Sequence, residues 1–248
     1  AVLPVLVRPE ELGGEPDRLL LEQLRGERGT RWVFVGRLAP NKRQHVLIAA
    51  LSVYRNVYDP DARLRLVGGS SSPAYERALR QYAADLGVAD AVELTGAVSA
   101  AARNSHYEAA DVFVCASGHE GFCVPLLESW HHKLPVVAVA AAAVPETLGS
   151  AGLLIPTPSP QVLAATAARV AGDRDLAAAL RTAGTARLEL YSIERGRDRL
   201  LELATALFEG LADRTTPGRV THGRTVPGRT VPARTAGAVT ATLEPGAR

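Results

Sequence analysis

Short apolar segments alternate with longer amphipathic segments along the chain as far as about residue 211. The apolar segments are of strand length and predict buried strands at residues 32–36, 64–69, 92–96, 111–116, 135–139 and 152–155. The amphipathic segments carry apolar residues at helical spacing and predict helices at residues 44–57, 74–86, 100–109, 124–132, 159–171, 173–190 and 194–211. This alternation predicts an α/β fold in which a doubly wound, mostly parallel sheet is covered by helices on both faces.

The pattern changes after Leu211. Arginines recur every five residues from 214 to 234, and no aromatic residue follows Phe208. Such a segment cannot bury enough apolar surface to offset the entropy lost on ordering it. We therefore predict an α/β domain over residues 1–211 and a disordered tail, rich in Arg, Pro, Gly and Thr, over residues 212–248.

The charge is distributed unevenly between these two parts. The chain has a formal net charge of +2, but residues 212–248 hold six arginines and two acidic residues, a net charge of +4. The rest holds 22 basic and 24 acidic residues, so no polyanionic partner is expected for the body. The tail lacks aromatic residues for base stacking, which favours a solvated tail with no nucleic-acid partner. Peripheral association with an anionic membrane is left open.

Cysteine content and hydropathy indicate a cytoplasmic location. Cys115 and Cys123 are too few for a disulfide framework, and neither belongs to a CxxC or Cys/His zinc pattern, so no metal site is predicted. The longest apolar run, residues 134–145, is well short of the ~20 residues that span a bilayer. No signal-peptide pattern opens the chain. Because the chain contains no methionine, we expect it to be a piece of a longer protein.

Ligands of parallel sheets bind beyond the carboxyl ends of the strands, so the loops after the strands are the places to look for chemistry. The first such loop begins at Gly36, where glycine allows close approach of a ligand to the backbone. Arg37 and Lys42 flank a turn that enters a helix, which suits a clamp for a phosphate or diphosphate. The loop alone does not distinguish this clamp from two ordinary surface cations.

A second loop follows the strand that ends at Cys115. It carries Glu120, and Glu128 follows eight residues later in the next predicted helix. Carboxylates accept hydrogen bonds only, so a pair of them suits the hydroxyl groups of ribose and a hexose. Between them lie backbone amides that would be unpaired at a helix start and available to a ligand, those of Gly121, Phe122, Cys123 and Val124.

Other candidates are weaker when taken singly. The turn that ends at Val98 could accept the edge of a flat base, although an ordinary βα turn is the favoured interpretation. His131 and His132 lie at a predicted helix end, where cations complement the helix dipole, and we assign them a structural role. His119 adjoins Glu120 but has no recognisable partner as a base or ligand.

Taken together, these motifs resemble the carboxyl-terminal donor-binding domain of family 4 retaining glycosyltransferases (glycosyl transferases group 1), which have the GT-B architecture. The resemblance covers about residues 2–209. It rests on the Gly-Arg-Leu to Lys pattern at residues 36–42, the Glu-x7-Glu motif at 120–128, Val144-Pro145-Glu146 and residues 151–156. Two features depart from the family pattern: four alanines occupy residues 140–143, and Cys123 replaces the more usual glycine.

The resemblance implies a Rossmann-like domain that binds a nucleoside diphosphate sugar, without a metal or other cofactor. Arg37 and Lys42 would hold the diphosphate and stabilise it as it leaves. Glu120 and the following amides would hold the transferred sugar, Glu128 the ribose, and Val98 would lie near the base. The acceptor, a sugar, lipid or small molecule, would bind an amino-terminal GT-B domain that this chain does not match.

The expected reaction is transfer of a hexosyl group from a nucleoside diphosphate sugar to an acceptor with retention of configuration. One alternative is a nucleotide-sugar binding module that is inactive without a separate acceptor domain. A less favoured alternative is a sugar-nucleotide epimerase of the same architecture.

Overall fold

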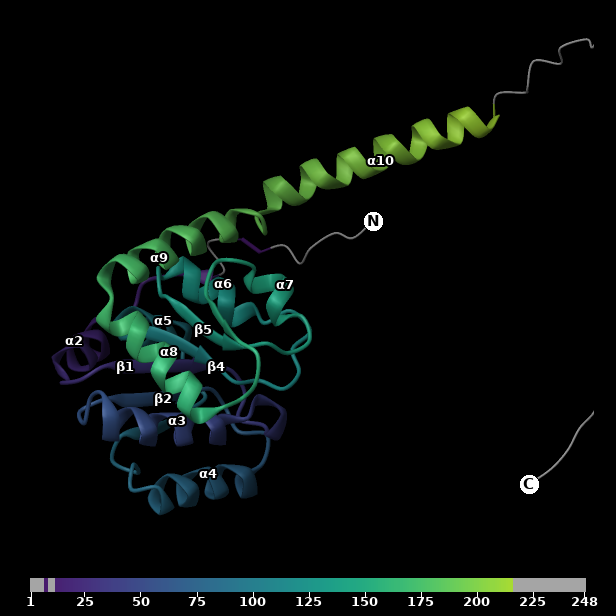
Figure 1. The fold of residues 1–248 in the computed structure, drawn as a ribbon. Helices are drawn as coiled ribbons and strands as arrows, with labels where there is room; N and C mark the ends of the chain where they lie inside the picture. Colours follow the sequence, from purple (N-terminus) through teal and green to yellow (C-terminus); the bar gives the residue numbers. More distant parts are fainter. Residues whose placement is uncertain (1–6, 9–11, 216–248) are drawn as a thin grey trace, which may run out of the picture. The chain divides into compact units, whose positions relative to one another are not determined.

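Six parallel strands form the sheet at the centre of the protein (Figure 1). The computed structural model describes residues 7–8 and 12–215, with side chains as far as residue 208. The strand order is β3-β2-β1-β4-β5-β6. The strands are β1 (Arg31–Val35), β2 (Arg63–Val67), β3 (Val92–Gly96), β4 (Val112–Cys115), β5 (Val136–Val139) and β6 (Leu153–Ile155).

Helices connect and cover the strands. The chain enters the sheet through α2 (Arg18–Gly26), and the crossover elements are a 3-10 turn η1 (Pro40–Lys42), α3 (Gln44–Val57), α4 (Pro73–Asp85), α5 (Ala100–Ala109), α6 (Val124–His131) and α7 (Val144–Leu148). Three helices follow the last strand: α8 (Pro160–Gly172), α9 (Arg174–Glu189) and α10 (Ile193–Thr215). Within this described part, no helix is both long enough and apolar enough to cross a bilayer.

The order of the strands places the helices on opposite faces. After β1 the chain moves outward through α3 and α4 to β3, and then returns through α5 to β4 on the other side of β1. Because parallel crossovers are right-handed, this reversal puts α5 on the face opposite α3 and α4. α3 packs against α8 and α4, whereas α5 packs against α2, in agreement with two helical layers. The reversal between β1 and β4 is the topological switch point at which such sheets bind ligands.

The core is formed by the strands and the apolar faces of these helices. Four of the five residues of β1 and all four of β4 are buried, as expected for strands covered on both faces. Trp32 and Phe34 of β1 are among the largest side chains that are fully buried. Because these strands are buried on both faces, packing on each side defines where the loops that follow them begin.

The predicted fold class is confirmed, and each predicted strand overlaps an observed one. The predicted helices at 44–57 and 100–109 have the observed bounds. Three short elements, α2, η1 and α7, were not predicted. α2 has nine residues and α7 has five, so each spans fewer than three helical turns over which an apolar period can repeat.

The boundary at residue 211 stays a prediction. α10 continues to Thr215, so residues 212–215, expected in the tail, are helical. A compact unit ends at Thr205, and the remainder of α10 belongs to a second unit. Residues 216–248, which contain most of the arginine repeat, lie outside the described residues.

Candidate functional site

The loop after β1 is held to its neighbours by backbone hydrogen bonds. The Gly36 amide donates to Val67 O and the Leu38 amide to Gly69 O, both at 2.9 Å, and Leu38 is fully buried. The Gln44 side chain donates to the Arg37 carbonyl at 3.0 Å. The Arg37 side chain is exposed, and no described acceptor pairs with its guanidinium group. The loop therefore fixes the backbone of Arg37 and leaves its charge available to a ligand.

Lys42 and Glu120 form an ion pair across the switch point. Lys42 Nζ lies 2.7 Å from Glu120 Oε2, and the Glu120 side chain is about 10% exposed. The Gly118 amide donates to Asn41 O at 2.8 Å, so the loop after β4 is joined directly to the loop after β1. The two predicted loops therefore lie in direct contact.

The segment between Glu120 and α6 has free backbone donors. Among the described residues, no acceptor pairs with the amides of residues 121–124. α6 begins at Val124 and is preceded by Cys123, which has φ 69° in the left-handed region. The carbonyl of Glu120 accepts from the Ala143 amide at 3.2 Å, which ties this segment to the alanine-rich turn. The expected helix-start donors are therefore present.

Glu128 is buried and held by two donors. Tyr107 donates its hydroxyl to Glu128 Oε2 at 2.7 Å, and Arg103 Nη1 lies 3.2 Å from Glu128 Oε1. Burial, followed by the nearby Glu128 charge, raises the pKa of Tyr107 well above its usual value, so its hydroxyl stays protonated and donates. His132 stacks on the Tyr107 ring, with centroids 5.2 Å apart and planes 10° apart. Glu128 is thus a fixed, oriented carboxylate.

Two adjoining cavities open at the carboxyl ends of the strands. One, of about 380 Å³, is lined by residues that include Arg37, Lys42, Glu120 and Cys123. The other, of about 410 Å³, is lined by Gly68, Gly69, Val98 and Arg103 among others. Both share Val35, Gly36 and Arg37. The exposed cation Arg37 therefore stands where the two cavities meet.

The structure brings together most residues singled out in the sequence. Gly36, Arg37, Lys42, Glu120 and residues 122–124 line the first cavity, and Val98 lines the second. Glu128 lines neither cavity and reaches the second through Arg103. His119 is exposed and takes no part in these contacts.

Two site residues, Arg103 and Tyr107, were missed from the sequence. They lie four residues apart in α5, hence on one face of that helix, which directly follows the turn containing Val98. Their i, i+4 spacing, directly after a candidate ligand-binding turn, was the sequence signal that could have identified them.

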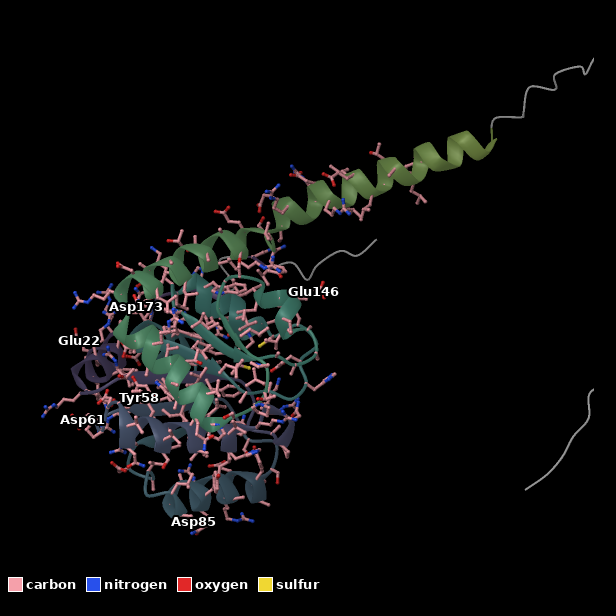
Figure 2. All side chains as sticks on the ribbon, viewed as in Figure 1. Glu22, Tyr58, Asp61, Asp85, Glu146 and Asp173 are labelled. Carbon is pink, nitrogen blue, oxygen red and sulfur yellow. The ribbon has the colours of Figure 1, made fainter. Side chains whose placement is uncertain are left out.

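A family model described as glycosyl transferases group 1 matches residues 29–173, more than half of the chain. The chain belongs to this glycosyltransferase family. Glu146, in the Val-Pro-Glu segment that resembles the family, lies on α7 (Figure 2). The matched segment includes β1 to β6 and therefore both cavities.

Curated relatives of this glycosyltransferase chain include two kinds of enzyme. A GDP-mannose-dependent alpha-(1-6)-phosphatidylinositol monomannoside mannosyltransferase of Mycobacterium tuberculosis (strain CDC 1551 / Oshkosh) is 36% identical over 64% of this chain and 42% of its own. A D-inositol 3-phosphate glycosyltransferase of Geodermatophilus obscurus is 35% identical over 75% of this chain and 43% of its own. The chain thus spans less than half the length of these relatives.

A solved structure shows the same fold in an isolated domain. The C-terminal domain of a glycosyl transferase group 1 family protein from Francisella tularensis matches with a TM-score of 0.64 and 25% identity, over 75% of this chain and 99% of its own. Most of the glycosyltransferase chain therefore matches a single domain of that protein. None of the comparisons supports the epimerase alternative.

Proposed function

We propose that this chain is the donor-binding domain of a retaining family 4 hexosyltransferase that uses a nucleoside diphosphate sugar. One observation carries the proposal: two cavities of about 380 and 410 Å³ meet at Gly36 and Arg37. A nucleoside diphosphate sugar has the same order of parts, with a polar sugar and a nucleoside joined by a doubly charged linker.

The diphosphate would lie at the junction of the cavities. The guanidinium of Arg37 supplies planar paired donors, and the ammonium of Lys42 has three donors, of which Glu120 uses one. Lys42 can therefore contact phosphate oxygens while it keeps its ion pair. The unpaired amides of residues 121–124 add neutral donors at the start of α6.

Glu128 would receive ribose hydroxyl groups next to the cavity that contains Val98. A carboxylate has about four lone-pair sites, and Tyr107 and Arg103 each take one. The lone pairs that remain can accept hydroxyl donors that reach Glu128 from the second cavity beside Arg103. Val98 presents apolar surface to the base in the same cavity.

Transfer would rest on electrostatic stabilisation of the departing diphosphate. Arg37, Lys42 and the amides are held in place before the reaction, so little reorganisation is needed as negative charge develops. Glu120 would hold the transferred sugar at the end of the first cavity. These groups supply the stabilising charge from the protein itself, and we propose no metal or other cofactor for the reaction.

GDP-mannose is the first donor to test, because a relative that is 36% identical bears the name of a GDP-mannose-dependent mannosyltransferase. The acceptor would be a sugar, lipid or small molecule. It would bind a second, amino-terminal domain that closes the donor cavity from the other side. We place the reaction in the cytoplasm.

One alternative is a module that binds the nucleotide sugar and transfers nothing by itself. Transfer of labelled mannose should be assayed with and without a supplied amino-terminal domain from a relative. Turnover by the isolated chain would exclude the module, and turnover only in the mixture would support it.

Calorimetric titration with GDP, UDP and ADP and with their sugars tests the donor site itself. We expect Arg37→Ala and Lys42→Ala to weaken nucleotide binding by about tenfold or more, because each removes a charge-assisted contact. Arg174→Ala is the matched control, since Arg174 is the first residue of α9 and lines a separate cavity with Thr30 and Arg31 at the opposite strand ends. Parental affinity in both site variants would refute the clamp.

A further inference from the structure

Two thiols and a carboxylate meet in the first cavity. The sulfur atoms of Cys115 and Cys123 and a carboxylate oxygen of Glu120 all lie within 4.8 Å of one another. Both cysteines are free and buried, and all three residues line the same cavity. We propose that Cys115, Glu120 and Cys123 bind a zinc ion, with its fourth coordination position open to the cavity.

The ligand chemistry selects zinc from the common divalent ions. Thiolates are soft ligands that favour Zn²⁺, whereas Mg²⁺ and Ca²⁺ prefer oxygen atoms. Three protein ligands with one open position form an established tetrahedral arrangement for zinc. The zinc site is thus assembled in space from residues that have no zinc-type spacing in the sequence.

The surrounding charges balance a bound ion. Two thiolates and the Glu120 carboxylate carry a charge of −3, which Zn²⁺ and the Lys42 ammonium neutralise together. Lys42 already holds Glu120 Oε2 at 2.7 Å, which leaves the other carboxylate oxygen for the metal. Ser117 Oγ lies 3.4 Å from the Cys115 sulfur and can donate to its thiolate as an outer-shell partner. Each bound zinc releases the two thiol protons to solvent.

The backbone at Cys123 makes the proposal easy to test. Its φ of 69° crowds the Cβ of an L-residue against the backbone, whereas glycine adopts the same conformation without this penalty. Cys123→Gly therefore removes one ligand and relieves backbone strain in the same step. Cys123→Ser keeps the strained backbone and a polar side chain but removes the soft ligand.

Occupation of the zinc site would exclude the donor sugar, a consequence that rests on the proposed function. The ion would take the carboxylate that we assign to the transferred sugar and would fill part of the same cavity. Zinc would then act as a reversible inhibitor of donor binding.

The direct test is a calorimetric titration of the reduced, metal-free chain with Zn²⁺. We expect one zinc per chain in the parent. Loss of an outer-shell partner typically weakens metal binding by about 10–100-fold. Cys123→Gly and Cys123→Ser each remove a direct ligand, so zinc affinity should fall by at least that much in both variants. Mg²⁺ should give no comparable binding. Absence of stoichiometric binding in the parent, or unchanged zinc affinity in both variants, would overturn the zinc site.

A cobalt spectrum and a competition experiment complete the test. Co²⁺ in the parent should show the absorption of thiolate-to-metal charge transfer, and Cys123→Ser should lose intensity. With one equivalent of zinc already bound, the parent should bind GDP-mannose at least tenfold more weakly, and unchanged affinity would overturn the inhibition. If the zinc-free chain binds no nucleotide sugar, the proposed function fails, while the titration and spectrum still decide the zinc site.

Discussion

The Lys42 ammonium lies 2.7 Å from the Glu120 carboxylate, although 78 residues separate them in the sequence. Lys42 comes from the loop after β1 and Glu120 from the loop after β4. The chain builds β2 and β3 on one side of β1 before it returns to place β4 on the other. The ion pair is therefore a product of the switch in strand order, and it connects the two loops on which the proposed donor site depends.

Removal of Lys42 should destabilise the fold as well as the site. Lys42→Ala leaves the Glu120 carboxylate largely buried and without its cation. We therefore expect the free energy of unfolding to fall by about 1–3 kcal/mol. Glu120→Gln removes the charge that needs a partner. The double variant should therefore lose less than the sum of the single losses, measured by urea denaturation. Strict additivity would show that the pair contributes no coupling energy.

Tyr107→Phe should weaken both stability and nucleotide binding. The variant removes the hydroxyl that donates to Glu128 Oε2 inside the protein, at an expected cost of about 1–3 kcal/mol. Tyr54→Phe is a matched control, because Tyr54 is also buried and its hydroxyl donates to Thr30 Oγ1 at 3.1 Å, away from both cavities. Affinity for the nucleotide should fall only in Tyr107→Phe. An equal effect in both variants would contradict a positioning role for Tyr107.

Two glycines in the site should respond differently to alanine. At Gly68, φ is +140° and a Cβ would lie 2.3 Å from Gly36 O, so Gly68→Ala must shift the loop that carries Arg37. We expect the free energy of unfolding to fall by about 1–3 kcal/mol or more, and nucleotide binding to be lost. A Cβ at Gly121 meets nothing within 4 Å, and Gly121→Ala should stay within about 0.5 kcal/mol of the parent. Thermal denaturation of both variants checks this, and equal stabilities would refute it.

Acidification should destabilise the protein through His132. Burial, followed by the charges of His131 and Arg103, lowers the pKa of His132 to about 4 from its usual value of 6.5. Between pH 6.5 and about 4 the unfolded chain holds a proton on this residue that the folded chain lacks, so the free energy of unfolding falls as the pH falls. His132→Phe keeps an aromatic ring stacked on Tyr107 but cannot bind a proton. The slope of unfolding free energy against pH should therefore fall by an amount that corresponds to at most one proton.

Denaturation of the parent and of His132→Phe at several pH values measures the effect. Burial also lowers the pKa of His106, so part of the acid sensitivity should remain in the variant. An identical pH dependence in the two proteins would show that His132 does not contribute.

The period of apolar residues was enough to predict the six strands, the larger helices and the parallel sheet. This succeeded because the central strands β1, β4 and β5 are buried on both faces and are almost wholly apolar, while their connecting helices need only one apolar face. The motifs at residues 36–42 and 120–128 could be found in the same way, since each follows directly after a strand. α2 and α7 were not predicted, because helices of nine and five residues contain fewer than three turns over which a helical period can repeat.

The sequence by itself determined which residues follow the strands, and hence which residues could carry the chemistry. Only the tertiary structure decided which of them meet. It paired Lys42 with Glu120, joined Glu128 to Arg103 and Tyr107, and brought Cys115 and Cys123 together in a single cavity. The physical reason is that strand order and crossover handedness set distances between loops. A linear pattern of residues records local periodicity and contains no measure of those distances.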